Sequence, residues 1–271
     1  MKEYIKKNKK GLILVSIGLF LLIFSLVMNK NLTKEDLKVS TISYNTDAEV
    51  PESKRLLSED ELLDIYINSN IDTFNFYSSM FQLDNSVLVN KIREDYQTLD
   101  LLNTDNLDKT ILFYIEQLEE NNSDLFDNKL NVSNPSKDYM VALIKYFTDI
   151  YDNVDFSIAA AIAQIESGYT SQHMLNKNNI FGGMSNGGLI KYKNIEYGIY
   201  RYIKLLSEGY FGKGLITVED IGRVYNPTYN ENGQKIAKPS WVNNVTIAME
   251  NYIETEDEVN IETLMNLKAE Q

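Results

Sequence analysis

The sequence predicts a mainly helical protein, and three observations support this fold class. After residue 57, apolar residues recur at intervals of three and four, which is the spacing of one face of an α-helix. Ser, Thr, Asp or Asn residues that can cap a helix stand in front of several of these segments. The dipeptide Asn186-Gly187 is a strong hairpin-turn signal, which predicts a short β-hairpin.

The start of the chain predicts a membrane anchor. Residues 1–10 are basic, and residues 11–28 contain no charge over a length near the lower limit for a membrane-spanning helix. Because positive residues stay on the cytoplasmic side, we expect a single-pass protein of the cell membrane whose C-terminal part is extracellular. A cleaved signal peptide is the alternative, but the residues after Met28 match a cleavage site poorly. Residues 29–56 are polar and aperiodic, which predicts a tether.

Residues 57–120 predict a small helical module. Ser58 and Glu61 have capping-box spacing, and Asp84 and Asp105 can cap two further helices. The simplest interpretation is that these helices pack on one another or on the domain that follows. A spacer, an extension of that domain's cleft and a surface for a protein partner are the alternatives. Residues 121–136 are rich in Asn, Asp and Ser, which predicts a linker.

Residues 137–253 predict a second helical domain. Four residues are placed to cap or open its helices: Ser136, Asn194, Thr217 and Pro239. Asn226-Pro227 is expected to end one of the helices, and residues 230–238 are expected to form a polar loop. Residues 254–271 carry six acids and one Lys, which predicts a mobile acidic tail.

The stretch from Asp155 to Gly168 predicts a buried helix that ends close to a carboxylate. Asp155 suits the N-cap position, and residues 159–163 are apolar on nearly every side. Gly168 can adopt the left-handed conformation that ends a helix, so Glu166 falls in the last turn. The helix dipole and the apolar surroundings both disfavour ionisation of Glu166 there. Such a group suits a general acid, and a solvated structural carboxylate is the alternative.

The composition excludes several kinds of site. The chain has no Cys, which excludes thiol nucleophiles, disulfides and thiolate metal sites. His173 is the only His, so a zinc site built from several His ligands is excluded, and no metal or other cofactor is predicted. The net charge of −13 argues against nucleic-acid binding, which needs a basic face.

Five short motifs in the second domain support a resemblance to a known family. In chain order they are AIAQIESGYTSQ, NNIFGG, YKNIEYGIYRYIKLL, VYNPTY and PSWVNNV. Together they resemble the lysozyme-like peptidoglycan hydrolases, in particular the N-acetylglucosaminidases of glycoside hydrolase family 73. The resemblance covers a little under half of the chain. It implies a lysozyme-like helical domain with a short β-hairpin over residues 137–253.

The resemblance also implies roles for single residues. Glu166 matches the catalytic acid of the family, and Tyr225 matches a Tyr that faces this acid. Asn179, Phe181 and Gly182 match a loop that lines the sugar cleft. For Tyr225 and Phe181 the alternative is a place in the core.

Two further residues extend this expectation. The amide of Asn178, like that of its neighbour, suits the acetamido and hydroxyl groups of a sugar, and loop capping is the alternative. Trp241 matches a Trp that opens a helix in the family and is interpreted as structural packing.

A second catalytic carboxylate is harder to find. Most glycosidases use two, but no acid lies between Ser167 and Lys193. Glu196 is the nearest downstream candidate, although an early position in an amphipathic helix favours a solvated charge. Two routes need no second carboxylate. In one, the acetamido oxygen of the substrate attacks its own anomeric carbon; in the other, a sugar hydroxyl closes a 1,6-anhydro ring.

These observations predict a membrane-anchored enzyme that cleaves β-1,4 bonds of peptidoglycan glycan strands as an endo-β-N-acetylglucosaminidase, with one Glu as general acid and base. A lytic transglycosylase, which forms 1,6-anhydro-N-acetylmuramic acid ends, is the first alternative. A non-catalytic glycan-binding or scaffold protein is the second.

Overall fold

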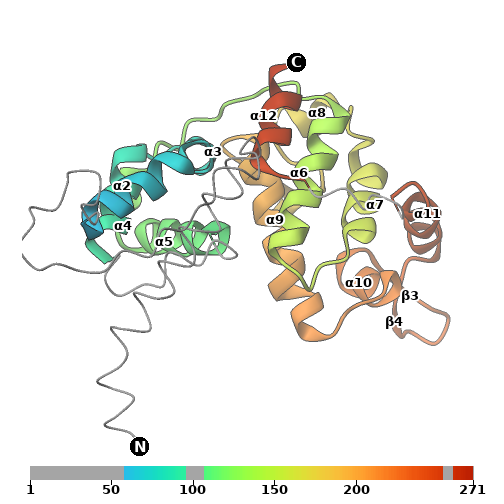
Figure 1. Ribbon diagram of the computed structural model, residues 1–271. Helices are drawn as coiled ribbons and strands as arrows, with labels where there is room; N and C mark the ends of the chain where they lie inside the picture. The colour runs from blue at the N-terminus through green and yellow to red at the C-terminus, as the bar shows by residue number, and fades with distance from the viewer. Residues whose placement is uncertain (1–57, 96–106, 253–258, 271) are drawn as a thin grey trace, which may run out of the picture. The chain divides into compact units, whose positions relative to one another are not determined.

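The computed structural model describes residues 58–95, 107–252 and 259–270, and it is 64% helical with a few short strands (Figure 1). This confirms the mainly helical fold class. The predicted anchor at residues 11–28 lies outside the described residues, as do the basic segment and the tether. Among the helices that are described, none combines the length and apolar character needed to cross a membrane.

Four helices occupy the first part of the described chain: α2 (Glu59–Ser69), α3 (Ile71–Phe81), α4 (Asn85–Asp95) and α5 (Leu107–Asn121). The capping box is confirmed, because the Glu61 amide donates to the Ser58 hydroxyl and the Ser58 amide donates to the Glu61 carboxylate. The sequence did not predict α3. No side chain caps its first turn, and its composition is poor in strong helix formers, so burial of Phe74, Tyr77 and Phe81 is what stabilises it.

The predicted linker at residues 121–136 is fastened to the rest of the protein. It contains the 3₁₀ helix η4 (Ser123–Leu125), and residues 127–136 have no regular secondary structure. The Asp127 amide donates to the Gln82 carbonyl at 3.0 Å, and the Asn131 amide donates to the Lys193 carbonyl at 2.7 Å. Residues from Leu57 to Gln271 accordingly group into one compact unit.

The helix that carries Glu166 lies at the centre of the second part. This helix, α7 (Phe156–Ser167), packs between α6 (Lys137–Ile150) and α11 (Pro239–Met249), as Figure 1 shows. All five residues from 159 to 163 are fully buried, as their apolar run predicted. The other elements of this part are α8 (Gln172–Leu175), α9 (Ile195–Gly209), η5 (Phe211–Lys213), α10 (Val218–Tyr225) and α12 (Ile261–Ala269).

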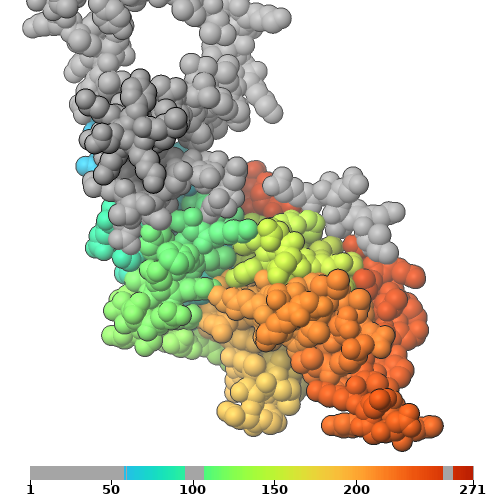
Figure 2. All heavy atoms as spheres, turned by 90° about the horizontal axis from the view of Figure 1, so that it is seen from below, coloured from blue at the N-terminus to red at the C-terminus, as the bar shows by residue number. Residues whose placement is uncertain are grey.

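Two β-hairpins project from the helices, and Figure 2 shows both on the surface, one in gold and one in orange-red. The first pairs β1 (Met184–Ser185) with β2 (Gly188–Leu189), which confirms the predicted Asn186-Gly187 turn. The second pairs β3 (Pro227–Tyr229) with β4 (Lys235–Ala237). The prediction of an irregular polar loop at residues 230–238 was therefore wrong in part. Asn230 organises this turn by accepting from the backbone amides of residues 232 and 234.

The acidic C-terminal segment is also partly structured. Instead of a mobile tail, it contains the helix α12, which Asn260 caps by accepting from the Thr263 amide. Leu264 is 1% exposed and joins the main core, where α12 packs on α6 and α3. The prediction of a mobile tail was wrong because it was based on the number of acids and not on the apolar residues of this helix.

Candidate active site

Glu166 lies in the last turn of α7, where the local sequence predicted it. Asp155 caps the start of the helix by accepting from the Ile158 amide at 3.1 Å, and Gly168 ends it with a left-handed φ of +57°. The side chain is half-buried. Burial raises the pKa of Glu166, and a hydrogen bond from Trp241 opposes this rise. A carboxyl group in this setting can give up a proton at a pH at which ordinary carboxyl groups are already ionised.

The two oxygens of the Glu166 carboxyl group have different neighbours. The indole N–H of Trp241 donates to Oε1 at 3.0 Å. The other oxygen, Oε2, lies against Gly182, where an added Cβ would stand 3.1 Å away. Gly182 also has a φ of +72°, a conformation that favours glycine, and a side chain at this position would crowd the carboxyl group.

The loop that follows α8 is held in shape by its own amides. The Asn178 side chain donates to the carbonyls of Asn131 and Tyr192, at 3.0 and 2.9 Å. The Asn179 side chain donates to the carbonyls of Gly183 and Ile190 and accepts from the Gly183 amide. Both Asn residues are almost fully buried. Their hydrogen bonds favour the loop-capping alternative over direct contact with a sugar.

Aromatic side chains pack against this loop. Phe181 is 1% exposed, and its ring stacks on Tyr202 with the centroids 3.7 Å apart. This favours the packing alternative for Phe181 over stacking on a sugar. The half-buried Tyr225 donates its hydroxyl to the Phe181 carbonyl, and its ring lies 5.4 Å from that of Trp241. Tyr225 therefore supports the loop and the indole, and its predicted catalytic role stays a prediction.

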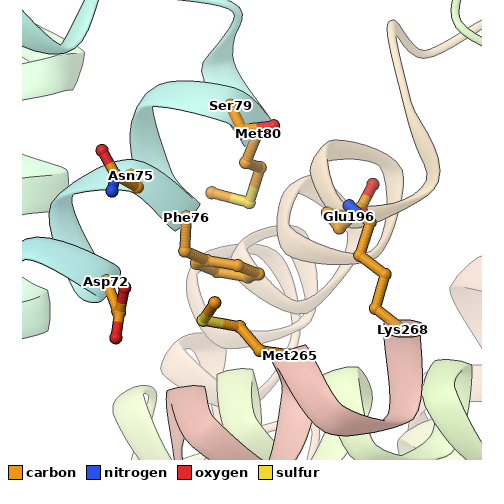
Figure 3. Close-up of a pocket in the computed structure, with 8 residues that line it drawn as sticks. All are labelled: Asp72, Asn75, Phe76, Ser79, Met80, Glu196, Met265 and Lys268. Carbon is orange, nitrogen blue, oxygen red and sulfur yellow. The ribbon is translucent and has the colours of Figure 1, made fainter. Parts of the chain in front are cut away.

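Glu196 lies in a different environment from Glu166. It is 7% exposed, so the expectation of a solvated charge was wrong. Its Oε1 accepts from the Tyr139 hydroxyl at 2.8 Å and from the Lys268 ammonium at 2.7 Å. Figure 3 shows Glu196 and Lys268 together at the edge of a cavity of about 210 Å³, whose other lining residues are Asp72, Asn75, Phe76, Ser79, Met80 and Met265. The residues that contact Glu166 are absent from this lining.

Sequence reasoning assigned Trp241 only to packing, whereas the structure adds a polar contact with the candidate acid. The sequence did contain a signal for this contact, because the N–H of a buried indole needs a hydrogen-bond acceptor. The sequence could not say which acceptor, since Trp241 and Glu166 lie 75 positions apart in the chain.

Within the described ranges, no group of three or more His, Asp or Glu residues is arranged to hold a metal ion. Comparisons with protein-family models, with curated proteins and with solved structures found no match.

Proposed function

We propose that this protein is a membrane-anchored peptidoglycan glycosidase whose lysozyme-like domain cleaves β-1,4 bonds of glycan strands, as an endo-β-N-acetylglucosaminidase. One observation carries the proposal: a half-buried carboxyl group, Glu166, has a raised pKa, one oxygen held by an indole N–H and the other beside a glycine. General acid catalysis of glycoside cleavage needs a carboxylic acid that is still protonated when it meets the leaving oxygen. The motifs around Glu166 add the resemblance to peptidoglycan hydrolases.

In the proposed reaction, protonated Glu166 donates its proton to the glycosidic oxygen while the bond to the anomeric carbon breaks. The acetamido oxygen of the same sugar closes on that carbon and stabilises the developing positive charge. Glu166, now ionised, takes a proton from the water that opens this intermediate. The carboxyl group thus acts first as acid and then as base, and it ends protonated again.

A lytic transglycosylase is the second candidate, and one observation favours a mechanism with a single carboxylate. Two carboxyl groups at the distance used by retaining glycosidases would raise each other's pKa. Burial is what raises the pKa of Glu166, and no other acid of the described residues contributes to the shift. In a transglycosylase, ionised Glu166 would take its proton from the 6-hydroxyl of the muramic acid residue, which closes the anhydro ring.

Digestion of purified peptidoglycan by the full-length chain in detergent tests the proposal, with the products identified by mass spectrometry. Reducible N-acetylglucosamine ends are expected, and 1,6-anhydro-N-acetylmuramic acid ends would establish the transglycosylase. Glu166→Gln should lower the rate by at least about a hundredfold, the scale of a lost catalytic acid. If the wild-type chain is folded but releases no product, the enzymatic proposal fails and the glycan-binding alternative replaces it.

A further inference from the structure

We infer that Trp241 is a positioning residue for Glu166: its indole N–H holds Oε1, so that the transferable proton of the carboxyl group resides on Oε2, beside Gly182. This inference rests on the proposed function for its catalytic meaning. The contact itself is independent of that function, because it is a hydrogen bond of 3.0 Å between α11 and α7.

The indole is fixed from several sides, so its N–H has a defined direction. Trp241 is 4% exposed. Gly222 of α10 lies so close that an added Cβ would stand 3.0 Å from an indole carbon. The ring of Tyr225 covers the indole at a centroid distance of 5.4 Å and an interplanar angle of 31°. At the start of α11 the Trp241 amide donates to the Lys238 carbonyl, which fixes the backbone.

A fixed donor on one oxygen distinguishes the two oxygens of a carboxylic acid. The oxygen that accepts the indole N–H uses a lone pair for this bond and is the weaker site for a proton. The proton is therefore expected on Oε2, and that oxygen lies beside the Gly182 loop rather than the indole. Because the same N–H stabilises the ionised form, it also keeps Glu166 able to ionise after proton transfer, as a base must.

Few other groups near Glu166 can titrate close to neutral pH. α7 and α11 carry no other charged residue. The phenols of Tyr202 on α9 and Tyr225 on α10 face the carboxyl group, and burial raises the pKa of both. On α10, Arg223 pairs with Glu219 and Asp220, and on α6, Lys145 pairs with Asp149. The Lys137 ammonium at the start of α6 lies 5.7 Å from the centre of the Tyr169 ring. On α8 the exposed His173 ring lies 3.3 Å from the Lys177 ammonium.

The chain offers a direct probe, because Trp241 is its only Trp. We expect the indole fluorescence of the full-length chain in detergent to change with pH in a single step, as Glu166 ionises beside the N–H, and this step should lie above the usual pKa range of a Glu carboxyl group because burial raises the pKa of Glu166. Glu166→Gln retains an oxygen acceptor but cannot ionise, so it should abolish the step. His173→Gln is the matched control, since it removes the only imidazole of the chain, and it should leave the step unchanged.

Three results of this titration would overturn the inference: a wild-type chain without the step, a step that persists in Glu166→Gln, or a step that disappears in His173→Gln. None of them depends on enzymatic activity. A step that behaves as expected in a chain that releases no peptidoglycan fragments would support the contact and overturn the proposed function alone.

The second experiment measures the catalytic consequence. Trp241→Phe keeps an aromatic ring but removes the N–H, so the pKa of Glu166 should rise further. The alkaline limb of the kcat/KM profile, where the acid loses its proton, should move up by about one pH unit. The maximal rate should fall by about tenfold, because the carboxyl group is no longer oriented. An unmoved alkaline limb would overturn the inference, and if this variant does not fold, the fluorescence titration still decides.

Discussion

At the scale of single residues, Glu166 is subject to two opposing effects. Burial at the end of α7 favours the neutral acid, while the Trp241 N–H favours the carboxylate, and burial is the stronger of the two. A group that serves as acid and then as base benefits from this opposition, because neither protonation state is strongly disfavoured. The two oxygens nevertheless differ, since only one of them accepts from the indole.

Gly182 provides a test of the space beside the second oxygen. In Gly182→Ala, the new Cβ would lie 3.1 Å from Oε2, and the left-handed backbone would be strained. We expect a loss of stability of about 1–2 kcal/mol from the backbone. We also expect a fall in kcat/KM of about tenfold to a hundredfold, because the carboxyl group must shift. Thermal unfolding and cleavage kinetics of the purified variant measure the two effects.

Gly187→Ala is the matched control for this substitution. Gly187 has a similar φ of +78°, but no atom lies within 4 Å of an added Cβ. It should lose about the same stability and keep its activity. Equal losses of activity in the two variants would assign the effect to backbone strain and not to the carboxyl group.

Local sequence signals predicted the position of Glu166 in its helix. They did not predict which residues form hydrogen bonds with the side chains of the site. Asp155 and Gly168 delimit α7 within one short stretch of sequence, so sequence alone was enough to find them. The amide of Asn178 instead bonds to the carbonyl of Asn131, 47 positions away. A single sequence says which groups need a partner, but it does not say which distant group supplies it.

At the scale of elements, the C-terminal helix α12 is joined to the start of α9 by an ion pair. Lys268 donates to the Glu196 carboxylate at 2.7 Å, and Tyr139 of α6 donates to the same oxygen. The Glu196 side chain is 9% exposed and that of Lys268 is 54% exposed. This asymmetry gives Glu196 a structural role, as the buried anion that fixes α12.

We therefore expect a double-mutant cycle with Glu196→Gln and Lys268→Met to give a coupling of about 1 kcal/mol in chemical unfolding. The exposed pair Lys109–Asp152, at 3.7 Å, is a suitable control and should give a coupling close to zero. Glu196→Gln should retain cleavage within a few-fold of the wild-type rate. A loss of more than about a hundredfold would instead restore Glu196 as the second catalytic carboxylate.

The elements that were predicted and those that were missed differ in where their stability comes from. Helices with a capping side chain and an apolar face, such as α6 after Ser136, carry both signals in their own sequence. No side chain caps α3, and α12 follows a run of acids, so their helical state depends on burial against other elements. The hairpin β3–β4 was missed although its turn contains the pair Asn232-Gly233, in which Gly233 has a left-handed φ of +73°. The polar residues around this pair predicted only a loop, and the side-chain bonds of Asn230 that organise the turn could not be read from the sequence.

At the scale of the whole molecule, the early helices are joined to the rest of the described unit through the end of α3. The Lys193 ammonium donates to the Phe81 carbonyl at 2.7 Å, and the Asn194 amide donates to the Met80 carbonyl at 2.8 Å. These are carbonyls at the C-terminus of α3, where a positive charge is favourable. Burial lowers the pKa of Lys193, and Glu119, 3.8 Å away, partly offsets this effect.

Aromatic packing joins the same two parts. The Phe81 ring lies edge-on to those of Tyr197 and Tyr200, at 5.3 and 5.4 Å, and is fully buried. Lys193 lies 4.4 Å from the centre of the Tyr197 ring. A chain without residues 57–136 would lose the Phe81 ring, uncover the Tyr197 and Tyr200 rings that pack on it, and leave the Lys193 ammonium without its carbonyl acceptor. Residues 57–120 thus behave as a structural part of the same unit, which favours the simplest interpretation of their sequence.

This arrangement leads to a prediction about folding. A chain that begins at residue 57 should unfold in one calorimetric transition, whereas a chain that begins at residue 137 should fail to fold, because it lacks the partner of a buried cation.

Lys193→Met in the longer chain tests the cause: it should lower the unfolding free energy by about 1–3 kcal/mol, the cost of a buried carbonyl that loses its donor. Lys129→Met is the control: Lys129 lies in the segment at residues 121–136, its side chain is 85% exposed, and its loss should change the unfolding free energy by less than about 0.5 kcal/mol. A stable, active chain beginning at residue 137 would instead show that the two parts fold independently and that the end of α3 is only a contact between them.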